Sequence, residues 1–181
     1  MNPSNEAERN LFSPLGEADR WRWIGASGTA ARQNVDTEQA DRLVEAARQA
    51  RALAYAPYSG FRVGAAVLPT GDTGIQTGCN VENASYGATI CAERSAIAAA
   101  IRAGAREIAA LALSLDSSTG TPPGDRSPCG ICRQVLAEFG TECTVIYLDN
   151  GPSGAAAISG DALGLEDLLP YRFRLSGKRT E

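Results

Sequence analysis

The strongest pattern in the chain is helical. Apolar residues recur three and four positions apart from Ala40 to Ala47, which is the spacing of one helix face. Asp36 stands ahead of this run as an N-cap, so the helix should begin there and extend to about Tyr55. Two later helices are predicted in the same way, over Thr89 to Ala103 and Gly130 to Phe139, and each is followed by a glycine that can end it.

Extended segments alternate with these helices. Two β-rich runs flank a stretch of turn formers, Pro69 to Gly74, and therefore predict a hairpin. A later apolar run suits a buried strand. The predicted strands are Phe61 to Leu68, Ile75 to Asn80, Ile108 to Leu115, Thr144 to Leu148 and Ala155 to Ile158. This order of elements indicates an α/β fold, a three-layer α/β/α sandwich with a mixed five-stranded sheet.

The beginning of the chain shows no such period. Residues 1–35 mix charges, glycine and two tryptophans, and we expect an N-terminal extension that is either flexible or packed on a neighbouring subunit. Residues 36–175 then form one domain, and residues 176–181 a short tail. A length of 181 residues suits a single hydrophobic core.

Composition and charge narrow the function classes. The hydrophobic content of 44% and charged content of 21% are normal for a globular protein. No stretch approaches the roughly 20 apolar residues of a membrane span, and residues 1–28 lack the apolar centre of a secretory signal. We therefore expect a cytoplasmic location and no membrane partner. The net charge is −4 and the basic residues are scattered, so no nucleic-acid partner is expected.

The residue types available for catalysis are restricted. The chain has five cysteines and no histidine. An odd cysteine count without an export signal favours metal binding or catalysis over a disulfide framework. A metal in this chain must be held by thiolates and carboxylates, and a general base is most readily a carboxylate.

Three cysteines stand at predicted helix starts. Cys129 and Cys132 lie three positions apart, on one face of a helix, and Cys91 opens the preceding helix. Free N–H groups and the helix dipole favour thiolates at such positions. The pair alone is compatible with zinc binding or thiol redox chemistry. Three protein ligands plus an open position are typical of catalytic zinc, whereas Cys79 or Cys143 as a fourth ligand would make the site structural.

Glu93 follows Cys91 by two positions. Such residues point about 200° apart on a regular helix, so they can converge only if Cys91 is the cap and Glu93 reaches across the first turn. A carboxylate beside a zinc-activated water is what proton transfer requires. An acidic residue is also common in a first helical turn without any catalytic role.

Taken together, five segments resemble the zinc nucleoside deaminases, specifically the small cytidine deaminases, over roughly Thr37 to Phe173. In chain order the segments are Pro57 to Ala66, Asn80 to Tyr86, Cys91 to Arg94, Pro128 to Val135 and Leu168 to Phe173. The signature of a metal-ligating residue before Ala-Glu, followed by Pro-Cys-x-x-Cys, is a known mark of these enzymes. Cysteine rather than histidine before Ala92 matches the three-cysteine, homotetrameric branch.

The resemblance implies a reaction and a ligand set. Cys91, Cys129 and Cys132 would hold one Zn²⁺ per subunit. Zinc-bound hydroxide would attack C4 of cytidine or 2′-deoxycytidine, Glu93 would shuttle the protons, and ammonia would leave, a reaction of pyrimidine salvage. Arg94 would donate to the cysteine sulfurs, which offsets the excess negative charge of three thiolates.

The resemblance also implies the substrate contacts. Asn80 and Glu82 would hold the ribose, and Phe61 would pack on the pyrimidine. Tyr86 and Phe173 would serve sites across subunit boundaries. The complete set of implied substrate-binding residues is Phe61, Asn80, Glu82, Tyr86, Ala92 and Phe173. Ordinary turn, surface and packing roles are the alternatives for these residues.

Two rival functions remain open at this point. One is deamination of another aminated nucleoside or a nucleotide, although a nucleotide should require phosphate-binding basic residues that the sequence does not reveal. The other is a non-catalytic, zinc-stabilised interaction domain, which would need a fourth protein ligand and no Glu93. The segment Asp116 to Ser127 is enlarged relative to the family's compact form, near the expected mouth of the site.

Overall fold

Among the residues that the structure describes, a mixed sheet of six strands organises the fold. The computed structural model describes residues 21–24, 35–116, 121–149, 151 and 159–175. Strand order is β1-β6-β5-β4-β2-β3, with parallel pairing in β1–β6 and β4–β5 and antiparallel pairing elsewhere. The strands are β1 Trp21–Trp23, β2 Val63–Pro69, β3 Gln76–Cys79, β4 Ile108–Leu115, β5 Gly140–Asp149 and β6 Gly160–Gly164.

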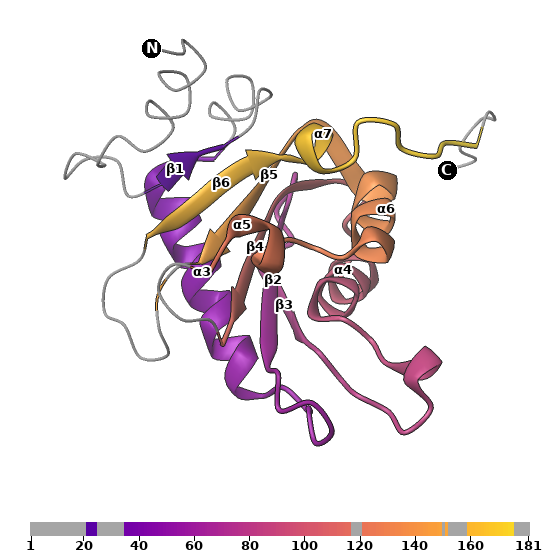
Figure 1. The fold of residues 1–181 in the computed structure, drawn as a ribbon. Helices are drawn as coiled ribbons and strands as arrows, with labels where there is room; N and C mark the ends of the chain where they lie inside the picture. The colour runs from indigo at the N-terminus through magenta and orange to yellow at the C-terminus, as the bar shows by residue number, and fades with distance from the viewer. Residues whose placement is uncertain (1–20, 25–34, 117–120, 150, 152–158, 176–181) are drawn as a thin grey trace, which may run out of the picture.

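Helices cover both faces of this sheet (Figure 1). α3 (Thr37–Ala52) lies on one face, while α4 (Ala92–Arg102), α6 (Gly130–Phe139) and the short α7 (Leu165–Leu168) lie on the other. Alternation along the strands separates the two cores. In β4, Ala110 and Ala112 face α3, whereas Leu111 and Leu113 face the other helices. The predicted α/β/α sandwich is confirmed.

Local sequence explains where the main elements begin and how closely they pack. Asp36 accepts a hydrogen bond from the Gln39 amide, and the Gln39 side chain accepts one from Asp36, which is a complete capping box for α3. Gly64 in β2 lies against the α3 backbone, and a Cβ there would come within 2.0 Å of the Ala47 carbonyl oxygen. Gly78 in β3 allows the same closeness to α4, since its Cβ would lie 2.3 Å from the Ala96 nitrogen. These two glycines allow the backbones of α3 and α4 to pack directly against the sheet.

The predicted elements agree with the structure at most positions. The helix 130–139 and the strand 108–115 have the predicted bounds, and the hairpin of β2 and β3 is confirmed. α4 begins at Ala92 rather than Thr89, because Ile90 forms an isolated bridge with Val81 after a 3₁₀ turn at Tyr86–Ala88. The predicted strand at 155–158 lies outside the described residues, and the last strand is at 160–164.

The count of five strands was one too low. Residues Trp21–Trp23, within the segment expected to be an extension, form β1 and pair in parallel with β6 of their own chain. The Trp21 ring packs edge-on against Tyr147, with centroids 4.8 Å apart. The loop 116–128 also contains a short helix, α5 (Pro123–Arg126). Within the described ranges, no helix combines the length and apolar character needed to cross a bilayer.

Candidate active site

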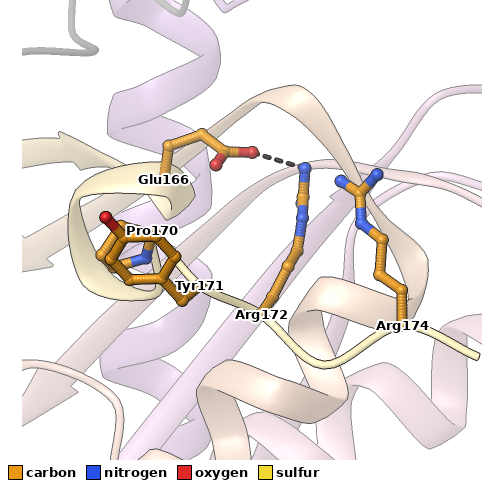
Figure 2. Close-up of a pocket in the computed structure, with 5 residues that line it drawn as sticks. All are labelled: Glu166, Pro170, Tyr171, Arg172 and Arg174. Atoms are coloured by element: carbon orange, nitrogen blue, oxygen red, sulfur yellow. Dashed lines mark ion pairs between the residues drawn. The ribbon is translucent and has the colours of Figure 1, made fainter.

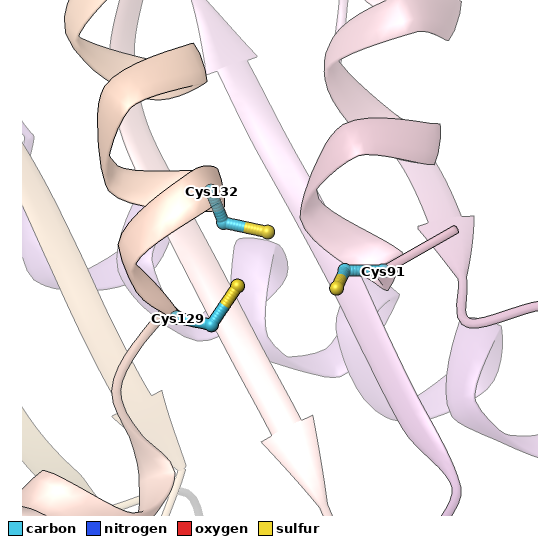
Figure 3. A group of neighbouring side chains, drawn as sticks. All are labelled: Cys91, Cys129 and Cys132. Atoms are coloured by element: carbon cyan, nitrogen blue, oxygen red, sulfur yellow. The ribbon is translucent and has the colours of Figure 1, made fainter. Parts of the chain in front are cut away.

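Two helix N-termini meet on one side of the sheet and bring three thiols together. Cys91 is the N-cap of α4, Cys129 is the N-cap of α6, and Cys132 lies in the first turn of α6. α4 and α6 run side by side, and the three side chains point into the space between their ends (Figure 3). All three sulfur atoms lie within 4.8 Å of one another. The expected position of Cys91 at a cap is confirmed.

This donor set fits a zinc ion. Zn–S bonds are about 2.3 Å, so two ligands of a tetrahedral site have sulfur atoms about 3.8 Å apart. The cysteine cluster needs only small side-chain adjustments to reach that spacing. Cys79 is not a member, since its Sγ lies 3.5 Å from the Leu53 carbonyl oxygen. The Cys143 side chain lies outside the described part of the chain.

The cluster is poised to supply thiolates. Hydrogen bonds from Cys132 and Cys129, together with the charge of Arg94, lower the pKa of Cys91 to about 5. The same contact with Cys91, reinforced by burial, raises the pKa of Cys132. Two helix N-termini with unpaired N–H groups add positive potential at the sulfurs. The contact between Cys91 and Cys132 therefore favours the thiolate form at Cys91.

Arg94 is held with its guanidinium beside Cys91. Its Nη2 donates to the Thr89 carbonyl at 2.7 Å, and its positive charge helps to lower the Cys91 pKa. The Nε of Arg94 is buried and has no hydrogen-bond partner among the described residues. A buried N–H of this kind costs free energy unless an acceptor is near. The structure thus leaves a donor available next to an electron-rich ligand set.

Glu93 is the acidic group of the cluster. Its side chain lies in the first turn of α4, only 6% exposed. Burial raises the pKa of its carboxyl group, and the neighbouring Cys91 thiolate adds to that rise. The Glu93 carboxyl also interacts with Cys132. The predicted convergence of Glu93 with the cysteines is therefore present.

Asn80 and Glu82 both organise the loop before β2. The Asn80 side chain accepts from the Val63 N–H at 2.8 Å and donates to the Phe61 carbonyl at 2.9 Å. Glu82 accepts hydrogen bonds from the Tyr58 and Ser59 N–H groups and from the Ser59 hydroxyl. These bonds, with the Ser59 hydroxyl first, lower the pKa of Glu82. The two side chains thus shape the segment that carries Phe61.

The aromatic residues expected at the substrate are largely solvent-accessible in the single chain. Phe61 is 44% exposed, Phe173 69% and Tyr86 80%, whereas Ala92 is fully buried. Tyr86 lies near Tyr58, with ring centroids 6.5 Å apart. These rings are more exposed than Cys91, which is half-buried, and Cys132, which is buried. The single chain therefore leaves them available for contacts with other molecules.

The C-terminal segment that carries Phe173 is anchored by residues that the sequence did not single out. Gln134 of α6 donates to the Phe173 carbonyl at 3.0 Å and accepts from its N–H at 3.2 Å. Arg133 donates to Pro128, Ser127 and Leu168. Their place directly after Cys132 was the available signal. α6 thus holds the metal cluster and the C-terminal segment together.

A separate hollow lies beside this segment. It has a volume of about 490 Å³ and is lined by Glu166, Pro170, Tyr171, Arg172 and Arg174. Figure 2 shows the ion pair between two of these residues, in which Arg172 Nη2 lies 2.5 Å from a Glu166 oxygen. None of the cysteines lines this hollow. The Glu166–Arg172 ion pair links the segment next to Phe173 to α7, and the hollow does not form part of the cysteine cluster.

Comparison with known proteins agrees with this site. Residues 37–148 match the family model of the cytidine and deoxycytidylate deaminase zinc-binding region. A cytidine deaminase of Halalkalibacterium halodurans is 43% identical over 133 residues, which are 72% of this chain and 91% of the relative. One of Mycobacterium tuberculosis is 44% identical over 122 residues, 67% of this chain and 87% of the relative.

Solved structures give the same result. The crystal structure of cytidine deaminase from Burkholderia pseudomallei is similar with a TM-score of 0.60 and 40% identity, over 74% of this chain and 98% of that chain. The M. tuberculosis enzyme structure has a TM-score of 0.58 and 40% identity, over 75% of this chain and 97% of that chain. With its three clustered cysteines, this chain belongs to the zinc-binding cytidine and deoxycytidylate deaminase family.

Proposed function

We propose that this protein hydrolyses cytidine and 2′-deoxycytidine to uridine and 2′-deoxyuridine with release of ammonia. The observation that carries the proposal is a buried carboxyl, Glu93, set against three cysteines that fit a zinc ion. The relatives named cytidine deaminase support the substrate class. A purely structural metal site would give no reason to bury a carboxyl group beside the thiols.

Glu93 moves the protons in the proposed reaction. When bound, zinc supplies Lewis acidity that brings the pKa of a water molecule to about 7. The Glu93 carboxylate accepts a proton from the water molecule that adds to C4 of the pyrimidine, and delivers this proton to N3. Glu93 then takes the proton of the C4 hydroxyl group and passes it to the C4 amino group, so that the C4–N bond breaks, ammonia leaves and C4 becomes a carbonyl. A pKa raised by burial suits this work, because the carboxyl must gain and lose a proton near neutral pH.

Arg94 adjusts the charge of the metal site. Three thiolates and one Zn²⁺ carry a formal net charge of −1, which opposes the ionisation of water. The Arg94 guanidinium lies beside Cys91, and its unpaired Nε is available to donate to a sulfur atom. Outer donors of this kind withdraw electron density from a ligand and tune the metal. We assign Arg94 this role together with the two helix N-termini.

The substrate contacts extend from the metal site to the loop before β2. One Asn80 N–H donates to the Phe61 carbonyl, which leaves the second for a ribose oxygen. Glu82 uses three acceptor positions on Tyr58 and Ser59, so a further position can accept from a sugar hydroxyl. Ala92, at the first turn of α4, bounds the base on the metal side, and Phe61 packs on the pyrimidine ring.

The proposed assembly is a homotetramer that shares its sites. Tyr86 and Phe173 are mostly exposed in the single chain, and we assign them to the sites of neighbouring subunits. The exposed apolar side chains include Tyr55, Tyr58 and Leu175 as well, and contacts between subunits would remove these side chains from water. We assign the reaction to pyrimidine salvage and the protein to the cytoplasm.

A substrate panel tests the proposed activity. Purified protein is assayed for zinc content and for deamination of cytidine, deoxycytidine and their 5′-monophosphates by the change in ultraviolet absorbance. We expect one zinc per chain and turnover of the two nucleosides, with much less turnover of the monophosphates. A zinc-loaded protein that deaminates only monophosphates, or none of the four compounds, would refute the proposal.

Subunit complementation tests the shared site separately. Glu93→Gln and Phe173→Ala chains are produced alone and together. In mixed tetramers, a chain that retains Glu93 receives Phe173 from its neighbour, so activity should rise well above that of either variant alone. If Phe173 acts in its own chain's site, mixing restores nothing and the sharing proposal fails.

A further inference from the structure

A buried ion-pair chain lies apart from the cysteine cluster. Asp161 in β6 is fully buried, and both of its carboxylate oxygens are bound by arginines. Oδ1 accepts from Arg22 Nε at 2.6 Å, and Oδ2 accepts from Arg126 Nη2 at 2.5 Å. A buried carboxylate is tolerated only when it is paired in this way. We call Arg22, Asp161 and Arg126 the Asp161 chain.

Arg126 connects this chain to the segment before a zinc ligand. Besides Asp161, its guanidinium donates to the Thr121 carbonyl at 2.9 Å and the Leu148 carbonyl at 3.2 Å. Its side chain is only 3% exposed. These bonds fix α5 against β5 and β6, and Cys129 follows Arg126 by three residues. The position of Arg126 therefore restricts where Cys129 can lie.

The same segment is held from the opposite side by α6. Arg133 Nε donates to the Pro128 carbonyl at 2.7 Å, and its Nη2 donates to the Ser127 hydroxyl at 2.9 Å. Hydrogen bonds of Arg126 thus hold the residues between α5 and α6 against the sheet, and hydrogen bonds of Arg133 hold them against α6. Because Cys129 lies between the segments that Arg126 and Arg133 hold, loss of the hydrogen bonds of either arginine should shift the Cys129 sulfur and weaken zinc binding.

β1 supplies Arg22, the second arginine that binds Asp161. β1 runs in parallel beside β6 (Figure 1), and the strand pairing places Arg22 in register with Asp161. The burial of Trp21 against Tyr147 holds β1 in place. β1 lies outside residues 37–148, which the family model matches. A strand added to the edge of the sheet therefore reaches the buried carboxylate that holds Arg126.

We propose that Arg126 is a positioning residue for Cys129, and that β1 supports it through Arg22 and their shared carboxylate Asp161. This role extends beyond the deamination reaction, because it concerns the geometry of the metal ligand in the free protein. It predicts that damage to the Asp161 chain lowers zinc affinity. A role in fold stability alone would lower the melting temperature and leave zinc affinity unchanged.

The test compares arginine variants of the full chain. Arg126→Gln, Arg126→Lys and Arg22→Gln are set beside Arg42→Gln, which changes an exposed arginine of α3 outside the Asp161 chain. The zinc dissociation constant is measured by competition with a chromophoric chelator, at a temperature where circular dichroism shows every variant folded. kcat and KM for cytidine are measured in parallel.

We expect Arg126→Gln to weaken zinc binding by about 10-fold, the lower end of the range for outer partners of metal ligands. Arg126→Lys should recover part of this loss, and Arg22→Gln should weaken binding by about 3-fold, as for a partly exposed ion pair. The proposal fails if Arg126→Gln folds and binds zinc within about 2-fold of Arg42→Gln. If Arg126→Gln does not fold, Arg22→Gln and Arg42→Gln are compared instead. Equal zinc dissociation constants for these two variants would overturn the role of β1.

Discussion

The two halves of the active site are built differently. The metal half consists of Glu93 and Cys132, both buried, with Cys91 and Cys129 at helix caps, and all of them belong to helices packed on the sheet. The substrate half that we propose consists of exposed rings on the segments before β2 and before α4 and on the C-terminal segment. Preorganised helices suit chemistry that tolerates little movement. Exposed rings suit a surface that a second subunit completes.

The largest expected effect follows from a change in the metal half. Cys132→Ala removes a buried ligand, so the variant should lose stoichiometric zinc and all measurable deamination. Cys79→Ala is the matched control, because the Cys79 thiol lies outside the cluster. Zinc content by atomic absorption and a cytidine assay check both variants. Retained zinc and activity in Cys132→Ala would show that the cysteine cluster is not the metal site.

A change in the substrate half should have an intermediate effect. Phe173→Ala should lower kcat/KM for cytidine by roughly 5- to 150-fold, since the loss of an aromatic contact with a base costs about 1–3 kcal/mol. Zinc content should stay the same. Tyr171→Ala changes a ring two residues away that is 96% exposed, and steady-state kinetics should show a much smaller loss. Equal losses in both variants would contradict a specific role of Phe173.

The smallest expected effect concerns the titration of Glu82. Hydrogen bonds from Ser59 and Tyr58 lower its pKa below the ordinary value of 4.5. Because the pKa of Glu82 is lower in the folded protein than in the unfolded chain, these bonds stabilise the fold at pH values above 4.5. This stabilisation is lost as the pH falls through the pKa of the folded protein. An NMR titration of the side-chain carboxyl carbon should show this low midpoint, and Ser59→Ala should raise it. An unchanged midpoint in Ser59→Ala would refute the loop-organising role of Glu82.

The sequence predicted the elements that have long local patterns. The capped start of α3 and the bounds of α6 follow from residues within one or two turns of each other. β1 was missed because three residues are too few to display a period, and its pairing partner β6 is about 140 residues away. The start of α4 was placed too early because the bridge of Ile90 to Val81 depends on a distant segment.

The metal half of the site could likewise be predicted, and its surroundings could not. The proximity of Cys129 and Cys132 follows from their spacing of three residues in one helix. Their proximity to Cys91 follows from the neighbouring N-termini of two helices. The contacts of Arg133 and Gln134 with the C-terminal segment link residues 35 and 39 positions apart. Only the packing of α6 against that segment creates them. The buried pairing of Asp161 depends in the same way on three separate elements.

Substitution of Glu93 by glutamine tests the central claim most directly, because it removes proton transfer and preserves size and the cysteine ligands. We expect Glu93→Gln to bind one zinc per chain and to lose roughly 10²- to 10⁴-fold in kcat for cytidine, the range for general acid–base catalysis. The exposed Glu107→Gln is the matched control and should keep full activity. A Glu93→Gln protein with wild-type kcat would contradict the account.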